Sequence, residues 1–301
     1  MSAYTAFLLA LELNSFSEAA RAMGYTQSAV SQMIKGLEED LGVTLLVRSR
    51  TGVSLTREGA ALLPHIRDVA NAHRVLSEQA AAVRGLEQGS VRIGTFTSVS
   101  SSLLPPAIKR FREQHPGIRF ELHQGLYHEV EAWVRDGVVD FSFTDLIRPT
   151  DFAFEPLIQD SLLLVCAKDH SLAQQTQVSV EQLASEPFIL LEEGRGGATL
   201  KRFLDAHPEL DVQYRVADDY SILNMVENRL GVAVLPEMVL RNTASRVAAL
   251  PLEPPLRRSL GIIFRRKAAL STAAQAFLRE LRAGIAEQQD KPTLYIEKEL
   301  C

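Results

Sequence analysis

Cysteine is scarce in this sequence, which has only Cys166 and Cys301 among its 301 residues. Two cysteines so far apart provide neither a disulfide framework nor a metal site, and free thiols are typical of a reducing compartment. Cys166 lies in the apolar run 162–167, which indicates a buried strand position, and a redox-sensing thiol is the alternative interpretation. We therefore expect no metal and no cofactor.

The sequence also lacks a hydrophobic run of roughly 18 to 20 residues, the length that crosses a membrane. Residues 1–10 contain no basic segment before their apolar residues, and no cleavage pattern follows, so we expect neither a signal peptide nor a membrane partner. Hydrophobic residues make up 46% of the chain and charged residues 23%, as in globular proteins. We predict a cytoplasmic protein with two or three domains.

Enzyme motifs and a general excess of positive charge are missing as well. The chain has no G-x-S-x-G elbow, no H-E-x-x-H pair and no phosphate-binding G-x-x-x-x-G-K-[ST] loop, so we do not expect an enzyme. The net charge is −5, and residues 1–60 contain five Lys/Arg against six Asp/Glu. A nucleic-acid interface would therefore have to arise from where individual charges lie.

The first sixty residues do contain the pattern of a helix-turn-helix. Apolar residues recur at helical spacing over 2–13. Ser17 and Gly24 are expected to begin and end a second helix, and Thr26 and Gly42 a third. A short turn between two helices, containing glycine, is the geometry of a helix-turn-helix.

The polar face of the third helix is the candidate DNA-reading surface. Its side chains are of the kinds that read base edges or hold phosphates: Gln27, Ser28, Ser31, Gln32 and Lys35. A solvated helix without any DNA partner would show the same residues, so this face alone leaves both interpretations open.

Residues 44–56 follow as two short strands around a turn at Thr51-Gly52, which is the pattern of a β-wing. Arg48, Arg50 and Arg57 cluster on or near this wing. Such local positive charge would hold phosphates or enter the minor groove. We therefore add Arg48 and Arg50 to the predicted DNA contacts.

A series of residues runs in register through this whole segment: Phe16-Ser-Glu-Ala-Ala20, Gln27-Ser-Ala-Val-Ser31, Leu37-Glu38, Leu41-Gly42, Leu45-Leu46, Arg48, Leu55-Thr56 and Gly59. This series resembles the signature of the LysR-type transcriptional regulators. The resemblance implies that the third helix enters the major groove and that Arg50 lies on the wing. Position 32 is often arginine in the family, so Gln32 is expected to make a less electrostatic contact here.

A regular apolar stripe marks the next segment. Its members alternate at spacings of four and three residues, which is the a/d seam of a helix over three heptads: Leu62, Ile66, Val69, His73, Leu76, Ala80 and Val83. The resemblance implies that two such linker helices pair antiparallel in a dimer. We assign residues 1–57 to the DNA-binding domain and 58–86 to the dimerising linker. His73 is expected to fix the pairing, and a pH sensor is the alternative.

From residue 90 onward, strands and helices alternate, which predicts an α/β domain with a mainly parallel sheet. Among the expected strands are 162–167 and 260–265. The segments Gly89-Ser-Val-Arg-Ile-Gly94 and Gly231-Val-Ala-Val-Leu-Pro236 resemble those of LysR-type effector domains. The resemblance implies a two-lobed type II periplasmic-binding-protein-like fold.

The predicted architecture is thus an N-terminal all-α winged helix-turn-helix with a long linker helix, followed by a two-lobed α/β effector domain over residues 90–301. Lobe 1 is assigned to about 90–160 and 267–289, and lobe 2 to about 161–266.

Ligands of such sheets gather beyond the carboxyl ends of the strands. The hydroxyl-rich segment 95–102 occupies such a place and runs into a helix N-terminus, which favours a small polar or anionic effector. Capping and loop roles are the alternative for these side chains, as a solvated loop charge is for Arg195, a candidate carboxylate clamp. The predicted effector contacts are Thr97, Ser98, Ser100, Ser101, Tyr127, His128, Thr144, Asp145 and Arg195.

These patterns together predict a sequence-specific transcription regulator controlled by a small molecule between two lobes. The expected partners are double-stranded DNA and a second copy of the chain in a dimer. The resemblance also implies a tetramer and contact with RNA polymerase. A solute-binding-like module without specific DNA control is the alternative.

Overall fold

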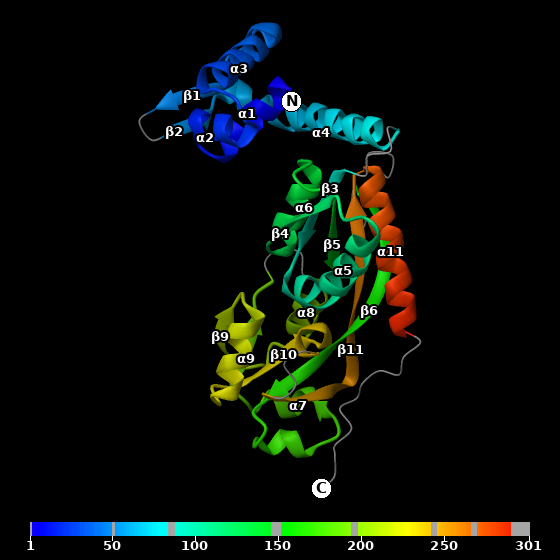
Figure 1. Cartoon of the computed structure of the whole chain (residues 1–301). Coiled ribbons are helices and arrows are strands. Elements are labelled where there is room, and N and C mark those ends of the chain that lie inside the picture. Colours follow the sequence, from blue (N-terminus) through cyan, green and yellow to red (C-terminus); the bar gives the residue numbers. More distant parts are fainter. Residues whose placement is uncertain are drawn as a thin grey trace. The chain divides into compact units, whose positions relative to one another are not determined.

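The computed structural model describes residues 2–49, 52–83, 88–145, 152–193, 198–241, 246–265 and 270–289. The chain divides into two compact units, residues 1–86 with 136–138 and residues 87–135 with 139–301. Figure 1 shows helices and a short hairpin in the first unit, and a long sheet flanked by helices in the second. Within the described ranges, no helix has the length and apolar character needed to cross a membrane.

Three helices build the core of the first unit: α1 (Ala3–Glu12), α2 (Phe16–Met23) and α3 (Gln27–Leu41). Gly24 and Gly42 adopt left-handed conformations at the ends of α2 and α3, and the Thr26 side chain accepts a hydrogen bond from the N–H of Ala29 at 3.2 Å. The predicted caps at these three residues are therefore confirmed.

The predicted start of α2 is wrong. Its N-cap is Ser15, whose hydroxyl accepts from the N–H of Glu18 at 3.2 Å, and Ser17 lies inside the helix. Phe16 explains the earlier start, because it is the first helical residue and its ring is buried in the core of the unit.

The wing consists of β1 (Leu46–Ser49) and β2 (Gly52–Leu55), paired antiparallel. Glu38 of α3 fixes its base, since one carboxylate oxygen accepts from the N–H groups of Leu45 and Leu46 at 2.7 and 3.1 Å. Asn14 accepts from the N–H of Val53 at 2.6 Å. Gly52 has a φ of 122°, and a Cβ there would lie 2.2 Å from the Asn14 oxygen, so the wing requires glycine at this position.

Helix α4 (Arg57–Val83) runs without a break through Pro64 and carries the predicted seam. The beginning of the seam lies in the first unit's core, where Ile66 is buried and Leu62 packs against it. Later residues of the seam are exposed: Val69, Leu76 and Val83 have 44%, 68% and 88% of their surface accessible to solvent.

The second unit is built on a sheet whose strands follow the order β4-β3-β5-β11-β6-β10-β8-β9, with β7 beside β11. Their bounds are β3 (Gly89–Thr95), β4 (Ile118–Gln124), β5 (Phe141–Asp145), β6 (Ala153–Cys166), β7 (Val178–Ser179), β8 (Phe188–Leu191), β9 (Val212–Val216), β10 (Val232–Pro236) and β11 (Ala248–Phe264). The pairs at both ends of the sheet are parallel, whereas β11 and β10 pair antiparallel with β6, and β11 with β5. Among the described strands the sheet is therefore mixed, with five parallel pairs towards its ends and beside β7, and three antiparallel pairs at its centre.

Helices cover this sheet: α5 (Leu104–Gln114), α6 (Tyr127–Arg135), α7 (Val180–Leu183), α8 (Ala198–Ala206), α9 (Asp219–Glu227), α10 (Glu237–Leu240) and α11 (Thr272–Gln289). A π-helical turn, Val99–Leu103, leads directly into α5, and a 3-10 turn, Ser171–Gln174, follows β6. Separate hydrophobic cores form in lobe 1, around Phe141 and Phe277, and in lobe 2, around Val165 and Phe188.

Strands β6 and β11 pass through both lobes (Figure 1). They contain 14 and 17 residues, so the predicted strands 162–167 and 260–265 covered only one end of each. The sequence pattern missed the remainder because polar residues interrupt the apolar runs there. Residues 260, 262 and 264 of β11 pack in the lobe 1 core, so the division between the lobes falls within β11 rather than near residue 266.

Candidate DNA interface and effector pocket

The polar face of α3 is accessible in the first unit. Gln27, Ser28, Gln32 and Lys35 are exposed, and Ser31 is partly buried. Because α3 begins at Gln27, all of these side chains except Lys35 occupy its first two turns, where the recognition helix of a helix-turn-helix contacts bases. Lys35 follows in the third turn.

Arg48 of the wing contacts the polar face of α3. Its Nη2 donates to Ser31 Oγ at 2.6 Å, and its guanidinium carbon lies 3.7 Å from the centre of the Phe16 ring. Lys35 pairs with Glu39 at 3.3 Å, both side chains being exposed, and such a pair is weak enough to open for another partner. Arg50 lies outside the described residues, so its role on the wing stays a prediction.

In the second unit, a pocket of about 190 Å³ lies where strand ends from both lobes meet. Lobe 1 contributes the segments that follow β3 and β4, including Ser98 and Tyr127. Lobe 2 contributes the segments that follow β8 and β9, including Glu193 and Asp219. Arg258 of β11 completes the lining. The carboxyl ends of strands are where α/β sheets bind ligands.

The Arg258 side chain is buried, with 2% of the residue exposed, and every part of its guanidinium has a partner. Nε and Nη2 donate to one oxygen of Asp160 at 2.9 and 2.7 Å, and Nη2 also donates to Ser98 Oγ at 2.7 Å. Nη1 donates to Tyr127 Oη at 3.2 Å and lies 3.7 Å from Glu193 Oε1. Asp160 stands directly opposite Arg258 in the ladder of β6 and β11, which sets this geometry.

Glu193 lies in a site with little positive charge. Burial raises the pKa of its carboxyl from 4.5 to about 7, because the loss of water outweighs the attraction of Arg258. Three neighbouring carboxylates raise the pKa of Glu193 further: Asp219, Asp145 and Asp160.

The pKa values of Asp219 and Tyr127 are also raised, mainly by burial. For Asp219, a hydrogen bond from the Thr97 side chain lowers the pKa and so offsets part of the effect of burial. Burial raises the pKa of the Tyr127 phenol well above its usual value, so the phenol stays neutral and keeps its proton. Among the described lining residues, Arg258 is the only cation.

Three of the predicted effector contacts line this pocket: Thr97, Ser98 and Tyr127. Ser100 and Ser101 are not in the lining and donate to the backbone carbonyl of Thr97, at 3.1 and 2.7 Å. They therefore hold the start of the π-helical turn.

The remaining candidates lie elsewhere. His128 is exposed on α6, and Thr144 and Asp145 are buried at the end of β5. One oxygen of Asp145 accepts from the N–H of Thr199 at 3.1 Å, while Asp145 Oδ1 and Thr144 Oγ1 have no hydrogen-bond partner among the described residues. Arg195 lies outside the described residues. The effector roles of all nine candidates stay predictions.

Sequence reasoning missed three charged residues that line the pocket, Arg258, Glu193 and Asp219, and also Asp160, which pairs with Arg258. One signal was available for the arginine. In a strand, residues two apart face the same side, and Arg258 shares its face with the buried Leu260.

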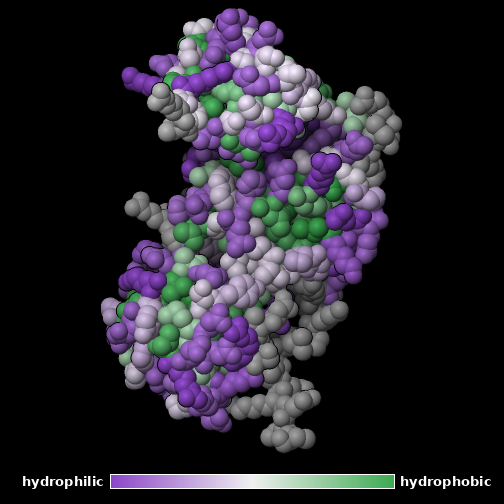
Figure 2. Space-filling model, turned by 60° about the vertical axis from the view of Figure 1, so that its left-hand side comes forward, coloured by the Kyte–Doolittle hydropathy of each residue, from purple (hydrophilic) through white to green (hydrophobic). Residues whose placement is uncertain are grey.

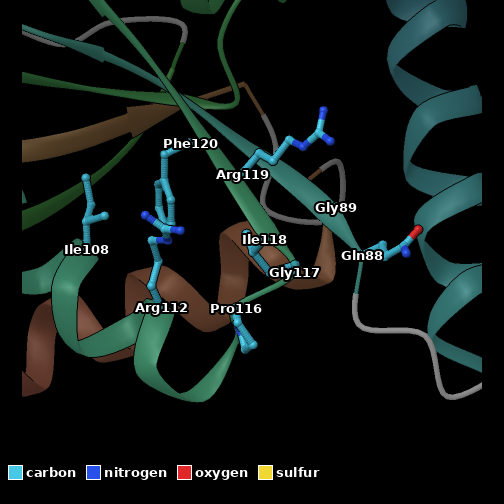
Figure 3. Close-up of a pocket in the computed structure, with 9 residues that line it drawn as sticks. All are labelled: Gln88, Gly89, Ile108, Arg112, Pro116, Gly117, Ile118, Arg119 and Phe120. Carbon is cyan, nitrogen blue, oxygen red and sulfur yellow. The ribbon is translucent and has the colours of Figure 1, made fainter.

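A second hollow, of about 950 Å³, lies on lobe 1 beside the start of β4. Figure 3 shows its lining residues, among them Arg112 on α5 and Arg119 and Phe120 on β4. Its described lining contains none of the predicted effector contacts and no residue of lobe 2. The smaller pocket is the stronger candidate site, because it joins the two lobes around a buried charge.

Comparison with known proteins identifies the family. Residues 1–60 match the family described as bacterial regulatory helix-turn-helix protein, lysR family, and residues 84–286 match the LysR substrate binding domain. YvbU of Bacillus subtilis, described as an uncharacterized HTH-type transcriptional regulator, is 30% identical over 276 residues, which span 90% of this chain and 94% of YvbU.

Solved structures share the fold. A full-length OxyR variant from Pseudomonas aeruginosa superposes with a TM-score of 0.72 at 21% identity, over 94% of this chain and 96% of that chain. Full-length CbnR in complex with its target DNA gives a TM-score of 0.55 at 19% identity, over 94% and 98% of the two chains.

The chain therefore belongs to the LysR family of DNA-binding transcriptional regulators and carries the family's effector-binding domain. The resemblance found in the sequence is confirmed. Family membership also makes the protein a regulator rather than an enzyme.

Proposed function

We propose that this regulator binds specific DNA sites as an oligomer and that a small molecule in the pocket between the lobes controls this binding. The observation that carries the proposal is the position of Arg258, which bonds to Ser98 and Tyr127 of lobe 1 and faces Glu193 of lobe 2. A molecule beside this guanidinium touches both lobes. It therefore has different contacts at different lobe angles, which is the condition for a ligand to shift a conformational equilibrium.

DNA recognition in this proposal uses α3 in the major groove. Gln27, Ser28 and Gln32 contact bases or backbone from the exposed face, and Lys35 neutralises a phosphate. Arg48 is held in place by Ser31 and Phe16 while its side chain remains exposed. A guanidinium with five N–H donors can keep the bond to Ser31 and still reach a phosphate.

Assembly in this proposal begins with α4. Val69, Leu76 and Val83 form an apolar stripe that the single chain leaves exposed, and a second α4 running antiparallel would cover it. Figure 2 shows hydrophobic residues gathered in a patch on lobe 1, and such patches are typical of protein interfaces. Pairing of effector units would make the tetramer. The ligand-dependent lobe angle would then change the contacts of the oligomer with DNA and RNA polymerase.

The DNA part is tested by selecting bound fragments from the host genome and footprinting them at two salt concentrations. We expect a protected, partly palindromic site whose affinity falls steeply with salt. Gln32→Ala should change the preferred bases, whereas Gln114→Ala, an exposed change on α5, should not. Only weak binding without sequence preference would refute the specific-regulator proposal.

The effector part is tested with a variant that fills the pocket. Ala217 lines the pocket and is exposed, so Ala217→Trp should occupy the cavity without disturbing either core. In a reporter strain carrying a selected site, this variant should bind the same DNA but no longer respond to growth conditions that alter wild-type output. Ala206→Trp, exposed at the end of α8, is the matched control. Identical responses of both variants would remove the pocket from the regulatory mechanism.

A further inference from the structure

The only cation among the described lining residues, Arg258, has four of its five N–H groups hydrogen-bonded within the protein. The Arg258 guanidinium uses its N–H groups on Asp160, Ser98 and Tyr127, and its remaining edge faces Glu193 at 3.7 Å. The one remaining Nη1 N–H lies on the edge that faces the Glu193 carboxylate, which repels an anion. A second bond to an anion would break one of the bonds above, and breaking a buried charged hydrogen bond is strongly unfavourable.

The hydroxyl-rich segment 95–102 likewise makes hydrogen bonds within the protein. Ser100 and Ser101 donate to Thr97, and the N–H groups of Val99 and Ser100 both bond to the carbonyl of Phe96. Ser98 accepts from Arg258. The hydroxyl and N–H groups that favoured an anion in the sequence are therefore largely hydrogen-bonded to other groups of the protein.

Acceptors, by contrast, are in excess. Glu193 has no hydrogen-bond donor among the described residues and meets its one positive neighbour only at 3.7 Å. Asp219 lies in the same lining and is buried, with 5% of its surface exposed and the Thr97 side chain as a hydrogen-bond partner. Glu129 adds an exposed carboxylate at the rim, which accepts from the N–H of Leu126 at 2.7 Å. Asp145, whose Oδ1 has no described partner, adds negative charge within range of Glu193. These carboxylates and Asp160 share Arg258 as their only cation in the described lining, and buried carboxylates that outnumber their counter-charges are unfavourable unless something supplies the missing charge.

We infer that the effector is a small molecule that carries a positively charged nitrogen and places it between Glu193 and Asp219. This inference rests on the proposed function of the pocket. The cavity of about 190 Å³ is below the usual range of roughly 300–1,000 Å³ for drug-sized ligands, so the molecule is small. Phe96 and Leu191 in the lining offer apolar contact to a short carbon skeleton. A primary ammonium or a guanidinium group fits this description.

The raised pKa of Glu193, about 7, gives the inference a distinctive pH signature. A cation needs the ionised carboxylate, so its affinity rises as the pH increases through about 7, and binding below that pH releases a proton. An anion would show the opposite trend. The ionisable groups that face Glu193 come from several elements: Asp145 of β5, Asp160 of β6, Asp219 of α9, Tyr127 of α6 and Arg258 of β11.

The test is isothermal titration of the full-length protein with matched probes of similar size. Butylamine and phenethylamine represent the cations, butyrate and phenylacetate the anions, and butanol and 2-phenylethanol the neutral compounds. We expect at least one amine to bind about tenfold or more tightly than its matched acid and alcohol, with affinity increasing between about pH 6 and 8. Titration in two buffers of different ionisation enthalpy measures the released proton.

Variants connect the binding to the proposed carboxylates. Glu193→Gln and Asp219→Asn should each weaken amine binding by about tenfold or more. Glu193→Gln should also abolish the pH dependence, whereas Glu192→Gln, an exposed change one residue away, should leave both unchanged.

Two results would overturn the inference. One is tighter binding of an acid than of its matched amine, and the other is failure of both amines to saturate the protein at about 20 mM, a concentration far above an ordinary effector affinity. The Ala217→Trp reporter test does not depend on ligand charge. A pocket that controls transcription but prefers acids would therefore refute the charge assignment alone.

Discussion

Replacing Glu193 by glutamine should stabilise the protein at neutral and alkaline pH and leave its stability nearly unchanged in mild acid. In the folded chain the pKa of this carboxyl is raised to about 7, whereas an unperturbed carboxyl has a value of 4.5. Between these two pH values the folded protein keeps the proton that the unfolded chain has released. The free energy of unfolding contributed by this group therefore falls as the pH rises from 4.5 to 7.

The size of the effect follows from the shift. A difference of about 2.5 pH units at about 1.36 kcal/mol each corresponds to about 3 kcal/mol of lost stability above pH 7. Glutamine has a similar shape and no titrating proton, so Glu193→Gln should recover an amount of this order at about pH 8. Relaxation of the pocket around the ionised carboxylate would reduce the recovered amount without changing its sign.

The assay is urea unfolding of the full chain at a series of pH values from about 5 to 8. Trp133 is the only tryptophan and lies on α6 of lobe 1, so its fluorescence follows the unfolding of the effector unit. The stability difference between Glu193→Gln and wild type should grow with pH, and Glu192→Gln should show no such trend. A difference below about 1 kcal/mol at every pH would refute the argument that burial dominates at this site.

Three further outcomes are expected. Asp160→Asn should lower the free energy of unfolding by about 3–5 kcal/mol, because Arg258 loses its main partner, and combining it with Arg258→Met should recover part of the loss in the same unfolding assay; an additive double variant would contradict this coupling. Leu76→Glu should dissociate oligomers in light scattering without loss of helical circular dichroism, and an unchanged mass would argue against the α4 seam. In a Cys301→Ser background, Cys166 should resist a thiol-reactive disulfide at about pH 8 until the protein unfolds, because burial raises the pKa of its thiol to about 11; rapid labelling would revive the redox interpretation.

The first unit could be predicted well from sequence because its signals are local. Thr26 caps α3 through the N–H of Ala29, three residues away, and Gly24 and Gly42 end helices through bonds within five residues. The one error, at the start of α2, came from the core. Phe16 had to be helical to pack inward, and no local rule distinguishes Ser15 from Ser17 as the cap.

The pocket could be located by sequence only in part, because its chemistry depends on distant pairing. Ser98 and Tyr127 were found because they follow strands, a position that the alternation of elements reveals. Arg258 and Asp160 are 98 residues apart, and only the register of β6 and β11 makes them partners. Glu193 is adjacent to the exposed Glu192, and their different environments follow from the direction of the chain after β8.

The same register places the ion pair in a regular stretch of the β6–β11 ladder between two irregularities, where the proposed change of lobe angle would have its pivot. The ladder between β11 and β6 is regular over residues 256–260, and it is interrupted on one side after residue 251 and on the other side after residue 260. Strands bend most readily at such irregularities, so the five-residue segment around Arg258 can stay intact while the lobes change their angle. The guanidinium then remains bonded to Asp160, and the change falls on its bonds to Ser98 and its approach to Glu193. A ligand that draws Glu193 toward its own positive charge would therefore alter the lobe angle without breaking the buried ion pair.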